Sequence, residues 1–116
     1  MSTPTEIAVE RRSGAIVAHL GGEVDMTNSG YVRDELVRSI PNDALGLVLD
    51  LATCRYLDSA AIEVVFDIAR RLGRRRQTVV VSLPPQSPLR RVLELTDVNA
   101  VAPLHDSLDE AVAAIG

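Results

Sequence analysis

Two short, uninterrupted apolar runs constrain the fold of this chain more than any other feature. LGLVLDL at residues 45–51 and TVVVSL at residues 78–83 each have the length of a strand, and neither alternates with polar residues. Such runs are typical of strands that are covered on both faces, as in sheets whose strands are connected by helices. Between them, residues 62–72 carry aliphatic side chains at helical spacing, and this stripe ends near Gly73. The sequence therefore predicts an α/β fold in which helices alternate with buried strands.

The beginning of the chain has the pattern of a β-hairpin. Residues 5–12 alternate between apolar and polar side chains, and the alternation resumes over residues 15–24. Ser13-Gly14 lies between the two segments, where glycine favours a tight turn. We therefore expect an N-terminal hairpin that joins the sheet through its second strand.

The remaining segments are predicted to add helices and one more strand. Helical spacing of apolar residues predicts three further helices, which follow Asp25, Ser87-Pro88 and Asp106. The short apolar piece at residues 98–104 is expected to hold a last strand. The complete prediction is a mixed β-sheet with an N-terminal hairpin and about four helices, connected by right-handed crossovers.

The size and composition of the chain fit one domain without cofactors. Its 116 residues can bury one core but not two, and 47% of them are hydrophobic, so we expect residues 1–116 to form a single domain. Cys54 is the only cysteine, which rules out an internal disulfide and favours a small buried residue. His19 and His105 have no partner cysteine or histidine nearby in the sequence. We therefore predict neither a metal site nor a cofactor.

Charge and aromatic content argue against binding to nucleic acid. The net charge is −4, which repels a phosphate backbone, and only 3% of residues are aromatic, too few for base stacking. We interpret a cluster of arginines as the solvated end of a helix: Arg70, Arg71, Arg74, Arg75 and Arg76. No window reaches the length of a membrane span, and the N-terminus lacks a signal-peptide pattern. We expect a cytoplasmic protein without membrane insertion.

Asp58-Ser59 lies at the predicted junction between a strand and the helix of residues 62–72. Both residue types are preferred helix caps, so capping alone could explain them. The alternative is that Ser59 displays its hydroxyl for chemistry. In α/β sheets function gathers at the loops that follow strands, and Gly22-Glu23-Val24-Asp25 ends another such strand. If the two strands are neighbours, both acidic loops lie at one edge of the domain.

Three pieces of the sequence together resemble a known family. They are Gly22-Glu23-Val24-Asp25, then Asp58-Ser59 followed by an aliphatic helix, then Ser87-Pro88 with the leucine-rich stretch up to residue 96. In this order and spacing, the chain from about residue 5 to residue 115 resembles a STAS domain, and specifically a bacterial anti-sigma-factor antagonist. The resemblance implies the STAS fold and a protein switch instead of an enzyme.

The resemblance also implies a partner and a modified residue. In that family the serine after the aspartate is phosphorylated by an ATP-dependent kinase that is itself the anti-sigma factor, and the unmodified antagonist binds this kinase. Ser59 stands at that position, and a phosphatase would be a further partner. The residues expected to contact the partner are Glu23, Asp25, Thr27, Asn28, Asp58, Ala60, Ala61 and Glu63.

The chain departs from the family pattern just after Ser59. The family has Asp-Ser-Ser/Thr-Gly-aliphatic-Gly, whereas this chain has Asp58-Ser59-Ala60-Ala61-Ile62-Glu63. Alanine in place of glycine stiffens the start of the helix, and the Glu63 carboxylate can disfavour a phosphate four residues away. These departures favour the alternative reading, a STAS interaction module without a phosphoswitch, such as a transport-system accessory subunit or a component of a signalling assembly.

Enzymatic activity is the least favoured class. The sequence contains no Walker loop, no dinucleotide fingerprint, no zinc-hydrolase motif and no nucleophile elbow. Asp25 and Asp58 could form a carboxylate pair for hydrolysis, but such a pair also requires a substrate pocket. We therefore predict no catalytic residue.

Overall fold

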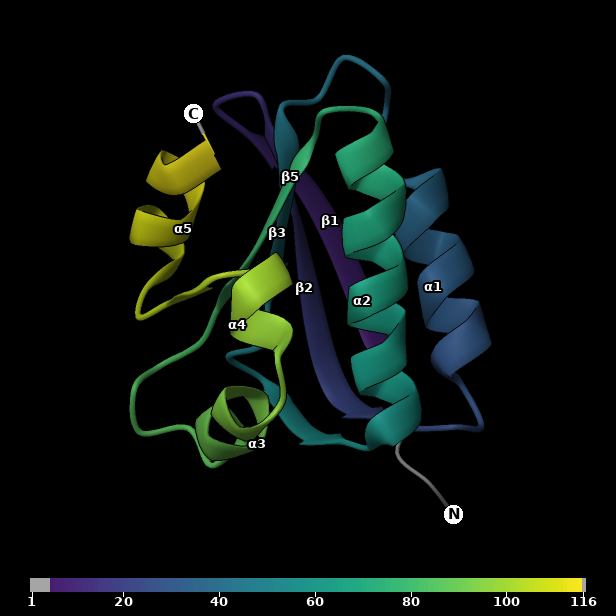
Figure 1. The fold of residues 1–116 in the computed structure, drawn as a ribbon, viewed down its shortest axis with the longest axis vertical. Coiled ribbons are helices and arrows are strands. Elements are labelled where there is room, and N and C mark those ends of the chain that lie inside the picture. The colour runs from purple at the N-terminus through teal and green to yellow at the C-terminus, as the bar shows by residue number, and fades with distance from the viewer. Residues whose placement is uncertain (1–4, 116) are drawn as a thin grey trace.

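The computed structural model describes residues 5–115 and arranges their strands in one mixed sheet with helices on both faces (Figure 1). The strands are β1 (Glu6–Arg12), β2 (Ala15–Val24), β3 (Gly46–Asp50), β4 (Cys54–Leu57), β5 (Thr78–Ser82) and β6 (Leu104–His105). The order across the sheet is β1-β2-β3-β5-β6, and β4 pairs with the end of β2. β1 is antiparallel to β2, whereas the other pairings are parallel. The predicted hairpin and mixed sheet are confirmed.

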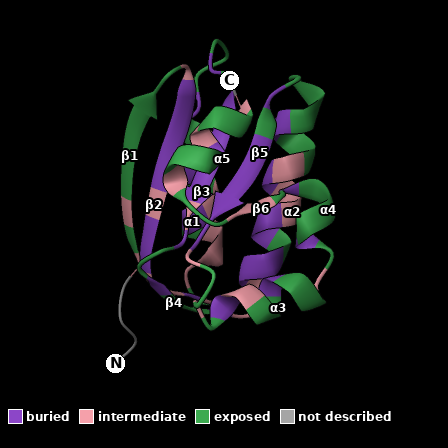
Figure 2. Ribbon diagram, turned by 90° about the vertical axis from the view of Figure 1, so that its left-hand side faces the viewer, coloured by how far each residue is buried: buried purple, intermediate pink, exposed green. Residues whose placement is uncertain are grey.

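Helices cover the two faces of the sheet unequally. They are α1 (Ser29–Arg38), α2 (Ser59–Arg74), α3 (Leu89–Leu95), α4 (Val98–Val101) and α5 (Leu108–Ile115). α1 and α2 lie side by side on one face, and α4 packs against α2. α5 lies on the opposite face, where it contacts β3 and β5 (Figures 1 and 2). Residues 5–115 contain five helices instead of about four, because α4 was not expected.

The two faces of the sheet carry two hydrophobic cores of different size. The larger core lies between the sheet and α1 and α2, where Leu36, Leu47 and Ile68 are at most 1% exposed. The smaller core lies under α5, where Val48 and Ala111 are fully buried. β3 therefore contributes Leu47 to one core and Val48 to the other, which confirms that residues 45–51 form a strand covered on both faces.

The segment of residues 98–104 is where the prediction was wrong. Val98–Val101 forms a helical turn, and only Leu104–His105 pairs with β5. Val98 and Ala102 are both fully buried. Their spacing of four residues places both side chains on one side of a helical turn, which a single apolar run does not distinguish from a strand.

β4 is a second element that was not predicted, and it positions the candidate site. Its four residues bury only the ends, Cys54 and Leu57, so it lacks the apolar run of a central strand. The pairing of β4 with β2 contains an irregularity between Gly22 and Glu23, and Gly22 has φ of +79°. A glycine tolerates this backbone conformation and so lets β2 continue beside β4. The loops after β2 and β4 consequently emerge next to each other.

Candidate functional site

Asp58 joins the two loops that were predicted to form the site. It is the N-cap of α2, and its Oδ1 accepts a hydrogen bond from the amide of Ala61 at 3.0 Å. Its Oδ2 accepts one from the amide of Met26, in the loop after β2, at 2.9 Å. The Asp58 amide donates to the carbonyl of Val24 at 3.3 Å. One residue therefore closes the helix end and fastens the loop of residues 25–28 to it.

Ser59 is the first residue of α2, and its side chain is exposed. Because Asp58 provides the cap, the Ser59 hydroxyl is not required for that purpose. The hydroxyl lies at the start of a helix of 16 residues, where the macrodipole is positive and negative charge is favoured. The sequence left helix capping and an exposed hydroxyl as alternatives for Asp58-Ser59. In the structure Asp58 caps the helix, and Ser59 is exposed.

Asp25 is held by its own loop. Its Oδ1 accepts hydrogen bonds from the hydroxyl of Thr27 and, at 2.9 Å, from the amide of Thr27. These bonds, chiefly the one from the hydroxyl, lower the pKa of the Asp25 carboxyl. The backbone carbonyl of Asp25 accepts from the amide of Ser29 at 2.8 Å, where α1 begins. The loop therefore presents an ionised carboxylate in a defined position.

Asn28 ties the same loop to the end of β2. Its side-chain nitrogen donates to the carbonyl of Glu23 at 2.9 Å and to the hydroxyl of Thr5 at 2.7 Å. Its side-chain oxygen accepts from the amide of Asp25 at 3.0 Å. Asn28 and Thr27 thus brace the loop internally, a role that the sequence analysis did not assign to them.

The structure brings the predicted partner-contacting residues together at one end of the molecule, with one exception. Thr27 and Glu63 are exposed, as is the expected phosphoacceptor Ser59, and the half-buried members of the set are Glu23, Asp25, Asn28, Asp58 and Ala60. Ala61 is only 2% exposed and belongs to the large core. Its side chain cannot reach a partner, so we remove Ala61 from the expected contact residues.

Glu63 lies on an open groove between α1 and α2, close to Ser59 in the sequence. The groove has a volume of about 520 Å³, and its lining is mostly charged. It is lined by Ser29, Arg33, Ala60, Glu63, Val64, Asp67, Arg70 and Arg71. Arg70 and Arg71 both pair with Asp67, at 3.4 and 3.0 Å. Part of the predicted arginine cluster is therefore neutralised within α2.

Two exposed hydrophobic residues beside the carboxylates were missed by the sequence analysis. Met26 is 78% exposed and sits on the loop whose amide Asp58 holds. Tyr56 is 48% exposed and pairs with Glu23 in the β2–β4 ladder. Large exposed apolar side chains among polar ones are typical of protein-binding surfaces. The sequence carries one indication of this, because Met26 is an apolar residue between the polar residues Asp25 and Thr27.

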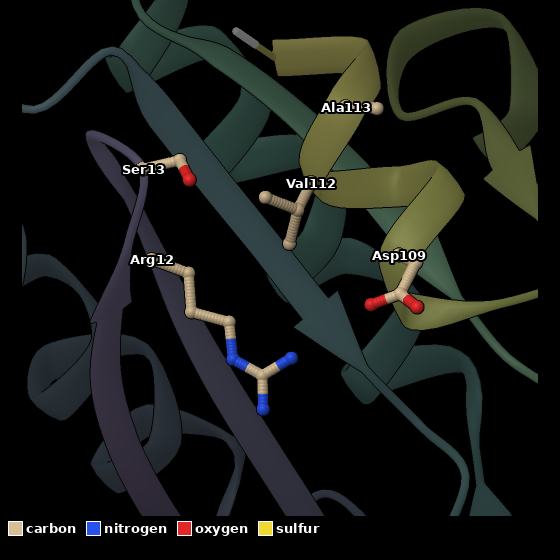
Figure 3. Close-up of a pocket in the computed structure, with 5 residues that line it drawn as sticks. All are labelled: Arg12, Ser13, Asp109, Val112 and Ala113. Atoms are coloured by element: carbon tan, nitrogen blue, oxygen red, sulfur yellow. The ribbon is translucent and has the colours of Figure 1, made fainter.

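A second hollow, on the other side of the molecule, does not resemble a substrate pocket. It has a volume of about 470 Å³ and lies between the β1–β2 turn and α5 (Figure 3). Arg12 and Asp109 face it from opposite sides, with Val112 and Ala113 on α5. Arg12 is already paired with Glu10 at 2.6 Å. Converging polar groups, which would support a small-molecule enzyme, are not assembled at this hollow.

Two further titratable side chains, His19 and Cys54, lie in β2 and β4. Both ring nitrogens of His19 contact carboxylates at 2.6 Å, one from Glu10 and one from Asp50. Within residues 5–115, no group of three or more histidine, cysteine or acidic residues is arranged to hold a metal ion. Burial raises the pKa of the Cys54 thiol, and the predicted buried position of this cysteine is confirmed. No helix in the described part of the chain could span a membrane.

The mixed sheet, the capped α2 and the two adjoining loops define a protein of the STAS class. The chain belongs to the STAS domain family, whose model matches residues 6–111.

Individual relatives fall into two groups. The chain is 27% identical to the putative anti-sigma factor antagonist BtrV of Bordetella bronchiseptica, with 94% of this chain and 93% of the relative aligned. It is 30% identical to the probable sulfate transporter 3.5 of Arabidopsis thaliana, but there 92% of this chain matches only 18% of the relative. Among solved structures, an anti-sigma factor antagonist from Mycobacterium paratuberculosis superposes with a TM-score of 0.84 at 25% identity, covering 99% of this chain and 98% of that one.

Proposed function

We propose that this protein is an anti-sigma factor antagonist that binds an anti-sigma factor through the surface around Ser59. The observation that carries the proposal is the arrangement at the start of α2. Asp58 caps the helix, and Ser59 is exposed beside an acidic loop. The relative named as an antagonist supports it, because the alignment with BtrV covers 93% of that protein. The protein would act by binding in the cytoplasm and not by catalysis.

We further propose that phosphorylation of Ser59 by the anti-sigma factor, acting as a serine kinase, switches this binding off. A phosphoserine adds roughly −1.5 to −2 charges at neutral pH. Here the charge would fall next to Asp58 and near the loop of Asp25, whose carboxyl has a lowered pKa. The added negative charge and bulk would then expel the partner by repulsion and steric exclusion at the interface. The helix dipole accommodates the same phosphate, so the fold is kept.

The alternative function is a STAS interaction module that is never phosphorylated. Two observations favour it. Glu63 is exposed on the same helix four residues after Ser59, where its carboxylate opposes a phosphate. The sulfate transporter relative shows that sequences of this kind also occur within much longer transport proteins.

Binding and phosphorylation assays separate the two functions. The anti-sigma factor kinases of the source organism are purified, and the affinity of each for the parent chain, Ser59→Ala and Ser59→Asp is measured by calorimetry. The switch predicts tight binding of the parent and Ser59→Ala and weak binding of Ser59→Asp. Intact-mass spectrometry with ATP then tests for one added phosphate in the parent and none in Ser59→Ala. Equal affinities with no mass change would leave the interaction module as the better description.

A further inference from the structure

β1 is the one long edge of the sheet that the described elements leave open. Six of its seven residues are exposed, and Val9, in its middle, is 42% exposed. β1 pairs only with β2, whereas the opposite edge, β6, has just two residues. In Figure 2 no element lies beyond β1 on its outer side. Such a strand presents unpaired amide and carbonyl groups that can accept another strand.

Symmetry limits how a second copy of the chain could pair with this edge. Two identical strands pair antiparallel when a two-fold axis runs perpendicular to the sheet, and this axis keeps each side chain on its own face. Residues that lie directly opposite must therefore share a face, so one residue lies opposite its own copy and the axis passes midway between the two. The registers with substantial overlap are centred on Ala8, on Val9 or on Glu10.

The charges of β1 distinguish these three registers. A register centred on Ala8 places Glu6 opposite Glu10 of the second copy, twice. One centred on Glu10 places the two Glu10 carboxylates opposite each other. Like charges in directly opposed positions destabilise a pair of strands. Both of these registers are therefore unfavourable.

The register centred on Val9 has the opposite property. It places Glu6 opposite Arg12 of the second copy, and the symmetry repeats this attractive pair. Glu10 then lies opposite Ala8, a small neutral residue, and the two exposed Val9 side chains meet at the axis. Natural edge strands use charge to block pairing with other strands. In β1 the charged residues Glu6 and Arg12 are instead placed so that two copies of the strand attract each other.

We propose that two copies of this chain associate through β1, antiparallel and centred on Val9, to form one continuous sheet. The interface contains no residue of the surface around Ser59, so this inference goes beyond the proposed function and does not depend on it. The contact is short, a single pair of strands, and belongs to the class of small, reversible interfaces. The dimer is therefore expected at high protein concentration.

Charge exchange at Glu6 and Arg12 tests this register. Sedimentation equilibrium of the parent chain, from micromolar to millimolar concentration, is expected to show a mass that rises from the monomer toward twice that value. Glu6→Arg alone and Arg12→Glu alone should each weaken association about tenfold or more, because two attractive pairs become repulsive. An equimolar mixture of the two variants should restore it, since every arginine at position 6 or 12 of one variant then faces a glutamate of the other. Arg91→Glu, an exposed charge reversal on α3, is the matched control and should leave association unchanged.

A measurement on the parent chain alone covers the case in which a charge variant fails to fold. Hydrogen exchange of the β1 amides is followed at low and high concentration, and the outward-facing amides should become protected as concentration rises. A mass that stays monomeric throughout overturns the proposal. Association that survives both single variants, or that the mixture does not restore while circular dichroism shows folded chains, overturns this interface. None of these experiments contains an anti-sigma factor, so they are independent of the proposed function.

Discussion

Asp58 illustrates how one side chain can serve both the fold and the site. Its two carboxylate oxygens accept hydrogen bonds from the amides of Ala61 and Met26, on two different elements. A preferred cap residue is worth about 1 kcal/mol to a helix, and here the same group also orders a loop. The conformation around Ser59 therefore depends on the hydrogen bonds of its neighbour Asp58.

Asp58→Ala is expected to lower the free energy of unfolding by about 1–2 kcal/mol, because the cap is lost and two amides lose their acceptor. Urea denaturation followed by circular dichroism measures this change. Asp97→Ala is the matched control, since Asp97 occupies the N-cap of α4 without making a side-chain capping bond. Equal destabilisation by the two substitutions would contradict the role given to Asp58.

The protonation state of His19 links the stability of the fold to pH. Its two ring nitrogens each contact a carboxylate, and Ser82 donates a hydrogen bond to Asp50 at 3.2 Å. Both nitrogens can donate only when the imidazole is protonated. The hydrogen bond to Glu10, followed by that to Asp50 and both charges, raises the pKa of His19 against the opposing effect of burial.

This raised pKa predicts a loss of stability as the solution becomes alkaline. Protonated His19 stabilises the fold fully below the unfolded pKa of about 6.5, and the contribution disappears as pH rises through the higher folded pKa. Denaturation midpoints measured from pH 6 to pH 9 should therefore fall for the parent chain. His19→Gln should flatten this decline, whereas His105→Gln should retain it. A parallel decline in His19→Gln would remove His19 as its cause.

At the scale of elements, α2 connects the core to the proposed switch. One side of the helix is buried, with Ile68 and Leu72 fully covered, while Ser59 and Glu63 are exposed near its start. Residues four apart are neighbours on a helix surface. A phosphate on Ser59 therefore meets the Glu63 carboxylate whatever partner approaches.

Glu63→Gln is expected to raise the rate of Ser59 phosphorylation by about 1.4- to 2.3-fold, because a nearby negative charge no longer opposes the incoming phosphate. Like charges at this spacing cost about 0.2–0.5 kcal/mol, which sets the size of the effect. The rate is measured by intact-mass spectrometry with a kinase shown to modify the parent chain. Glu110→Gln, on α5, serves as the control and should leave the rate unchanged. An unaltered rate in Glu63→Gln would show that Glu63 does not restrain the switch.

At the scale of the whole molecule, the proposed switch would change a surface and not the fold. Ser59 is exposed and lies outside both hydrophobic cores. Ser59→Asp should therefore leave the thermal midpoint within a few degrees of the parent, as surface substitutions usually do. Differential scanning calorimetry checks this expectation. A large fall would mean that any loss of partner binding by Ser59→Asp reflects unfolding and not repulsion.

Two surfaces of the molecule are thus assigned separate roles. The surface around Ser59 gathers loops from the ends of β2 and β4, whereas β1 forms one edge of the sheet (Figure 2). Their residues do not overlap, so a dimer formed through β1 leaves both copies of Ser59 uncovered by the pairing itself. One assembly could then present two switch surfaces.

Local pattern determined much of this structure from the sequence alone. The apolar runs at residues 45–51 and 78–83 predicted the buried strands, and the alternating residues 5–12 and 15–24 predicted the hairpin, because burial on one or two faces imposes a period. Residue types also marked Asp58-Ser59 as the start of a helix. These features depend on neighbours within a few positions.

Tertiary contacts decided what local pattern could not. β4 is a strand only because the end of β2 lies beside it, and Val98–Val101 is helical because Val98 and Ala102 pack into the same core. The loop after β2 is fastened to the start of α2 by the hydrogen bond from the Met26 amide to Asp58, 32 residues away in the chain. Such contacts join residues distant in sequence, so no local pattern encodes them, and the site exists only where the fold brings its two loops together.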